Sequence, residues 1–273
     1  MIQRIFTLTR YLITRLATSW IGGFYVALTL AYYGFAFRTR TPEADYFILV
    51  LGLFGAGISF FVAMTLASRA NEGKSAPFFV RLESRVEYLL SVFLASFGVG
   101  LALQLCLMFV VLLRNDPQLT FGRALDIPPI WLSLNVLAIL LAIHASDFVA
   151  RGWSRIWIFG GIALLLMVGD YLGWFLTLLT DLIQDLANRS TSPSTVQDLN
   201  EAASWLSSTD ASWSDGVAAV VRWPFEAIIN GVLDGGFTAT QAFAPALLII
   251  YATVLFFLAA HWFANKDLYL LEE

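Results

Sequence analysis

Six long apolar stretches constrain this chain more than any other feature of its sequence. A helix that crosses the hydrocarbon core of a bilayer, about 30 Å thick, needs about 20 mostly apolar residues. We expect the first stretch to be a span and not a cleaved signal peptide, because no small-residue cleavage site follows it. The sequence therefore predicts an all-α membrane protein with six transmembrane helices: Leu16–Phe37, Tyr46–Leu66, Tyr88–Leu113, Pro129–Val149, Ile156–Leu179 and Ala244–Phe263.

The overall composition agrees with a chain that lies mostly in lipid. Of its 273 residues, 59% are hydrophobic and only 13% are charged, whereas about a quarter of the residues in a soluble domain are charged. The net charge is -4, and no basic cluster with interleaved aromatic residues occurs, so the sequence gives no sign of nucleic-acid binding. We expect a multi-pass protein of the cell membrane, and we expect that membrane to be a bacterial inner membrane.

Basic residues predict the orientation of the spans. With the N-terminus inside, ten of the Lys and Arg residues fall on the cytoplasmic side and six on the other side. The positive-inside rule favours this arrangement. Both termini are therefore expected in the cytoplasm.

The first fifteen residues predict a separate element. Ile2, Ile5, Phe6, Leu12 and Ile13 share one helical face, and basic and hydroxyl side chains lie around the other. This periodicity is typical of an amphipathic helix in the membrane interface, here residues 1–15, ahead of a six-span domain over residues 16–273. A simple extension of the first span is the alternative.

The segment between the last two spans, residues 180–243, is long and predicted to lie outside the cell. Its amphipathic stretches are interrupted by Arg222, Pro224 and Glu226, so none is long and apolar enough to cross the bilayer. We expect a helical outer loop that dips into the membrane or lies on it. A small soluble cap is the alternative.

Residues that carry chemistry are few. The chain has one cysteine, Cys106, and two histidines, His144 and His261. A metal cluster or an internal disulfide is therefore not expected, and no phosphate-binding glycine-rich loop or hydrolase motif occurs. We predict no cofactor, no bound metal and no catalytic residue in this chain.

Asp170 is the one ionisable residue predicted within the hydrocarbon region. A charge there is costly and normally faces the bundle interior or water, often in a transport pathway. Gln104 and Asn135 are polar residues available as partners on other spans. The alternative interpretation is a protonated or hydrogen-bonded aspartate that joins two helices.

The longest predicted cytoplasmic loop, residues 67–87, mixes charges of both signs with an aromatic pair. Such a combination is typical of a segment that docks into a groove of a soluble partner. An interfacial anchor for the third span is the alternative. The predicted partner-binding residues are Arg69, Phe78, Phe79, Arg81, Glu83, Arg85 and Glu87.

The same loop resembles that of type-2 ABC exporter permeases. The order Arg69, Gly73, Ser84-Arg85, then Glu87-Tyr88-Leu89-Leu90 is similar to the family's loop entering the third span, and the ending "FANKDLYLLEE" is similar to the Phe-x-x-x-Asp-Leu ending of many members. The predicted architecture resembles the family over the whole chain. The sequence departs from the family pattern at Val86, Ser91 and Val92.

The resemblance implies a permease subunit of an ABC transporter that has no catalytic residues. In that family the loop holds a coupling helix that binds a separate P-loop ATPase subunit, and two permeases form a homo- or heterodimer. The substrate is expected to be hydrophobic or amphipathic and to move outward. The alternatives are a structural membrane subunit of a larger respiratory or photosynthetic complex and an intramembrane enzyme that uses Asp170 and His144.

Overall fold

The computed structural model describes residues 2–38, 42–70, 84–115, 117–149, 153–189 and 212–265, together with 196, 197, 199–201, 203 and 204. This part of the chain is helical and contains no strand. The all-α class is therefore confirmed. The chain divides into two compact units, residues 1–156 with 224–273 and residues 157–223.

Four helices of the described part are long and apolar enough to cross a membrane. They correspond to the second, third, fourth and sixth predicted spans, which confirms the multi-pass membrane character of the chain. A fifth apolar helix, α2 (Trp20–Ala36), has only 17 residues. The four are α3 (Ala44–Ala70), α5 (Arg85–Asn115), α6 (Phe121–Ala145) and α11 (Ala244–Ala264), the last preceded by the short helix η3 (Gln241–Phe243).

The bounds of the fourth span differ from the predicted Pro129–Val149. Helix α6 begins at Phe121, and the side chain of Thr120 caps it by accepting a hydrogen bond from the third backbone N–H of the helix. Pro128 and Pro129 both lie inside α6. A proline favours the first turn of a helix, but here the cap and the tertiary contacts carry the helix through both prolines.

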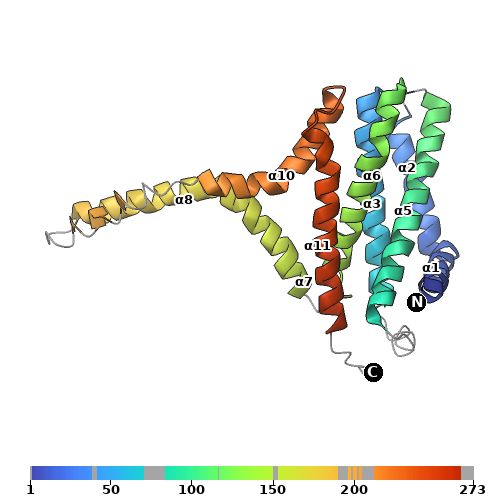
Figure 1. Cartoon of the computed structure of the whole chain (residues 1–273), viewed down its shortest axis with the longest axis horizontal. Coiled ribbons are helices and arrows are strands. Elements are labelled where there is room, and N and C mark those ends of the chain that lie inside the picture. Colours follow the sequence, from blue (N-terminus) through green and yellow to red (C-terminus); the bar gives the residue numbers. More distant parts are fainter. Residues whose placement is uncertain are drawn as a thin grey trace. The chain divides into compact units, whose positions relative to one another are not determined.

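These spans form one bundle in the first unit. Helix α3 packs along α5 and α6, and α11 packs against α6, as their parallel course in Figure 1 shows. Small residues let the backbones approach, as is common between membrane helices. A Cβ atom added at Gly55 of α3 would overlap the Gln104 amide, and one added at Gly100 of α5 would overlap the Ser59 hydroxyl.

Helix α1 (Ile2–Ala17) packs on α5 and α2. It is seen nearly end-on in Figure 1, so it runs at a steep angle to the bundle helices. Its apolar residues divide between two faces: Ile5 and Leu12 are buried against the bundle, whereas Ile2 and Phe6 are 69% and 67% exposed. The predicted location of α1 in the membrane interface stays a prediction.

The second unit contains α8 (Gly161–Arg189) and the first part of α10 (Ser212–Leu233). The fifth predicted span, Ile156–Leu179, covers a π-helical turn, η2 (Ile156–Gly160), and more than half of α8. Within the described residues α8 is not among the four helices that qualify as spans. It continues to Arg189, into what the sequence predicted as the outer loop.

Candidate functional site

The predicted partner-binding loop leaves the bundle from the end of α3 and returns at the start of α5. We call this end of the bundle the loop end. Arg69, Arg85 and Glu87 lie on these two helices. The other four predicted contact residues, Phe78, Phe79, Arg81 and Glu83, lie outside the described residues.

Arg85 joins the start of α5 to the end of α11. Its Nη1 donates a hydrogen bond to the carbonyl oxygen of Ala264, at 3.3 Å. That carbonyl belongs to the last turn of α11, where the helix dipole favours a positive charge. The interaction therefore fixes two helix ends to each other at the loop end.

Glu87 is buried, with 5% of its surface exposed. Its Oε2 has no hydrogen-bond partner among the described residues. One turn further along α5, the hydroxyl of Ser91 donates to the carbonyl of Glu87 at 2.7 Å and approaches the carbonyl of Ile5 at 3.4 Å. Burying a carboxylate without full hydrogen bonding is costly, so Glu87 is a constrained position in the bundle, and its predicted contact with a partner stays a prediction.

An aromatic cluster closes the same end. The ring of Phe148 lies 5.8 Å from that of Tyr88 and 4.4 Å from that of Phe263, measured between centroids. All three side chains are almost fully buried. The cluster joins the start of α5, the turn after α6 and the end of α11, and aromatic pairs of this kind add about 0.5–1.5 kcal/mol beyond the area they bury.

His144 contributes a further connection. Its Nε2 lies 3.0 Å from the carbonyl oxygen of Leu255, and its Nδ1 lies 2.6 Å from the hydroxyl of Ser154. A carbonyl can only accept, so Nε2 carries a proton and donates it to Leu255, and in the neutral imidazole Nδ1 accepts from the serine hydroxyl. This imidazole ties α6 to α11 and to the short helix α7 (Trp153–Arg155).

The two mid-span amides predicted as pathway residues meet in the core of the bundle. Asn135 Nδ2 donates to Gln104 Oε1 at 2.7 Å, and Gln104 Nε2 donates to the carbonyl oxygen of Leu51 at 3.0 Å. Both side chains are fully buried. The Leu51 carbonyl fixes the direction of this chain of donors, because it can only accept, and Asn135 Oδ1 is consequently left without a partner in the described part.

Asp170 is not placed beside these amides by any described contact. It belongs to α8, in the second unit, and its side chain lies outside the described part. Its predicted role in a pathway stays a prediction.

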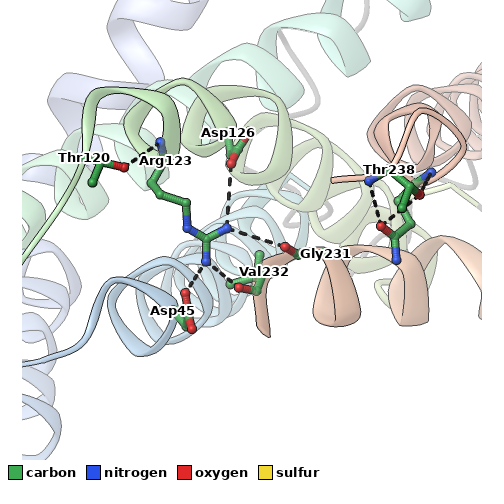
Figure 2. A network of polar contacts seen from close by, with 8 residues as sticks. Asp45, Thr120, Arg123, Asp126, Gly231, Val232 and Thr238 are labelled. Carbon is green, nitrogen blue, oxygen red and sulfur yellow. Dashed lines mark hydrogen bonds and ion pairs between the residues drawn. The ribbon is translucent and has the colours of Figure 1, made fainter. Parts of the chain in front are cut away.

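The opposite end of the bundle holds a buried cation that sequence reasoning did not single out (Figure 2). Arg123, in the first turn of α6, has a side chain only 10% exposed. Its guanidinium pairs with Asp45 of α3 and lies 3.8 Å from Asp126. It also donates to the carbonyl oxygens of Gly231, at 3.4 Å, and of Val232, in the last turn of α10.

This arrangement neutralises the charge of Arg123 and also supplies hydrogen-bond donors to the carbonyl groups at the end of α10. Carbonyls of a final helical turn lack partners within the helix and carry partial negative charge. Arg123 supplies both a charge and donors to them, while Asp45 ties the same guanidinium to the start of α3. We call this group the Arg123 cluster.

The described residues contain no group of three or more His, Cys, Asp and Glu side chains that could hold a metal ion. No protein-family model, curated protein or solved structure matches this chain.

Proposed function

We propose that this chain is the membrane-spanning permease subunit of an ABC transporter, which couples ATP hydrolysis by a separate ATPase subunit to outward movement of a hydrophobic or amphipathic molecule. In this proposal the six predicted segments all span the membrane, the termini are cytoplasmic and a second permease completes the transporter. The resemblance of the 67–87 loop and of the chain's ending to that family motivates the proposal.

The observation that carries the proposal most is the construction of the loop end. A segment that transmits force must begin and end on helices that are packed together, so that neither helix moves without the other. Here the loop connects α3 with α5, which pack along each other, and Arg85 and Tyr88 fasten the start of α5 to α11 and to the aromatic cluster. A force applied to the loop would therefore reach several helices of the bundle.

Helix α3 supports the same proposal. It is one uninterrupted helix of 27 residues, with Asp45 in the Arg123 cluster at one end and Arg69 at the entrance to the loop at the other. At about 1.5 Å per residue it spans about 40 Å. A displacement at the loop end would consequently be carried along α3 to the opposite end of the bundle.

The test of this proposal asks whether Phe78 and Phe79 hold the ATPase subunit. If Phe78 and Phe79 are the anchors in an ATPase groove, Phe78→Ala with Phe79→Ala should release the ATPase from the purified complex, because truncating one anchor costs about 2 kcal/mol or more. Reversing one charge, as in Arg81→Glu, should weaken association mainly at low salt. Association is measured by affinity purification followed by quantitative mass spectrometry.

A matched control uses two exposed aromatic residues from the other end of the bundle. Phe121 and Phe243 are 81% and 69% exposed, and Phe121→Ala with Phe243→Ala should leave the ATPase bound. Equal retention of an ATPase by both double variants would contradict the proposed docking by the loop.

A further inference from the structure

Helix α1 has apolar surface that its packing in the bundle does not use. Its buried residues follow one face of the helix: Ile5, Leu8, Thr9, Leu12 and Leu16. Ile2 and Phe6 lie about one turn apart beside this face, and both remain exposed. Helix α1 therefore carries more apolar surface than its contacts with α5 and α2 cover.

The exposed apolar residues lie on a flank of α1 that is turned toward the membrane-spanning part of the bundle. Ile13 shares this flank with Ile2, because eleven residues make about three helical turns. A Cβ atom added at Gly98 of α5 would lie 3.8 Å from the Cδ1 atom of Ile13. Gly98 lies about 20 Å along α5 from the first residue of that helix, and α5 is long and apolar enough to cross a membrane. We call Ile2, Phe6 and Ile13 the apolar flank.

Basic side chains occupy much of the remaining surface of α1. The helix carries Arg4, Arg10 and Arg15 and no acidic residue, and the first acidic residue of the chain is Glu43. Arg10 is exposed and follows Phe6 by one turn, so it borders the apolar flank. Within the described residues, neither Arg10 nor Arg15 forms an ion pair. An apolar flank bordered by positive charge is complementary to acyl chains that carry negatively charged headgroups.

The turn after α1 holds this surface at a fixed angle to the bundle. The Ser19 hydroxyl donates to the carbonyl oxygen of Leu16 at 2.7 Å and accepts from the backbone N–H of Gly22 at 3.3 Å. A Cβ atom added at Gly22 would lie 2.3 Å from the same carbonyl oxygen, so this close approach requires glycine. Trp20, directly after the cap, is exposed, and indole rings favour the membrane interface. The turn therefore presents α1 and Trp20 together.

We propose that α1 binds anionic phospholipids of the membrane leaflet at the loop end. The apolar flank contacts the acyl chains, and Arg10, together with Arg15, attracts the phosphate groups, which pair well with guanidinium. Zwitterionic lipids offer the same acyl chains without a net charge, so preference for the anionic lipid is the distinguishing property. This inference depends on the predicted location of α1 in the membrane interface and not on the proposed transport function.

Quenching of a fluorescent dye by brominated lipids measures which lipid lies next to α1. The dye is attached to a cysteine at Ala17, an exposed position of α1, in the full chain with the exposed Cys106 replaced by alanine. The protein is reconstituted in phosphatidylcholine with a minority of phosphatidylglycerol, and either one lipid or the other carries the bromine atoms. We expect the share of phosphatidylglycerol beside α1 to exceed its share in the bilayer at least about threefold, and to fall at high salt.

Charge variants of α1 supply the second comparison. Arg10→Gln with Arg15→Gln should return the share of phosphatidylglycerol to that of the bilayer, whereas Arg10→Lys with Arg15→Lys should keep most of the enrichment, because lysine keeps the charge. A matched control, Arg38→Gln with Arg114→Gln, removes two exposed arginines from the opposite end of the bundle and should change nothing.

Two results would overturn the preference for anionic lipid: no enrichment in the wild type, or an enrichment that the Arg10→Gln with Arg15→Gln variant retains. A dye at Ala17 that neither brominated lipid quenches would show that α1 lies away from the bilayer, and the proposal would fail with the interfacial location. None of these results bears on whether the chain binds an ATPase subunit, so the failure of this inference is distinguishable from that of the proposed function.

Discussion

Asn135, Gln104 and the Leu51 carbonyl form a chain of hydrogen bonds in the bundle core, and its direction predicts that Gln104 and Asn135 contribute differently to stability. Gln104 stands in the middle, donating to Leu51 and accepting from Asn135. Asn135 stands at the end and already has an unpartnered Oδ1. Replacing Gln104 with methionine, which has a similar length and no amide, would leave both polar ends of Asn135 buried without partners.

The expected magnitudes follow from counting unpartnered groups. An unsatisfied buried donor or acceptor costs about 1–3 kcal/mol, so Gln104→Met should lower the free energy of unfolding by about 2 kcal/mol. Asn135→Leu exchanges one unpartnered oxygen, on Asn135, for another, on Gln104, and loses only the bond between them. Such a bond between membrane helices is worth about 0.6 kcal/mol on average, so this variant should be the milder one.

The double variant separates this reasoning from a simple loss of contacts. Removing both partners with apolar groups of similar shape can be nearly neutral. Gln104→Met with Asn135→Leu should therefore be more stable than Gln104→Met alone. Leu107→Met, at a buried apolar position of the same helix, measures what a methionine costs by itself in this interface.

The assay is unfolding in mixed micelles with increasing sodium dodecyl sulfate, followed by tryptophan fluorescence. The predicted order of stability places Gln104→Met lowest and the double variant close to the wild type. If Asn135→Leu is as destabilised as Gln104→Met, or if the costs of the two changes simply add, the assigned direction of the amide chain is wrong.

Two further predictions come from the sequence. Cysteines at Ser75 and Asp267 should be protected from an impermeant thiol reagent added outside intact cells, whereas cysteines at Ser207 and Thr41 should react; labelling at Ser75 would reverse the predicted orientation. If Asp170 lines a pathway, Asp170→Asn should impair transport without reducing the amount of assembled protein, and Asp170→Leu should do the same. Full activity of both Asp170 variants, measured in reconstituted vesicles, would remove this residue from the pathway.

The helices that the sequence predicts best are those for which length and apolar content decide the structure. Helices α3, α5, α6 and α11 correspond to predicted spans, since a bilayer requires a long apolar helix whatever the neighbouring elements are. A polar residue within such a helix is costly unless it has a polar partner, and for that reason the sequence could indicate Gln104 and Asn135 as available partners of Asp170. The structure pairs these two amides with each other, and their pairing with Asp170 stays a prediction.

Features that depend on distant contacts could not be predicted in the same way. Arg123 looks like an ordinary loop cation in the sequence, because its partner Asp45 lies 78 positions away and its other partners are backbone carbonyls. The predicted fourth span begins at Pro129, whereas helix α6 begins earlier, at Phe121, directly after its capping residue Thr120. The π-helical turn that begins at Ile156 has no local signal apart from the two consecutive glycines at its end, Gly160 and Gly161.

The composition of the complex in the native membrane tests the central claim most directly. The chain is tagged at its C-terminus, extracted from its own membranes in a mild detergent or a lipid-preserving polymer, and purified by affinity. The proposed function predicts a P-loop ATPase subunit in a stoichiometric amount, with ATP hydrolysis in the purified complex. Purification with cofactor-bearing redox subunits and no P-loop ATPase would contradict the transporter and favour a structural subunit of an energy-converting complex.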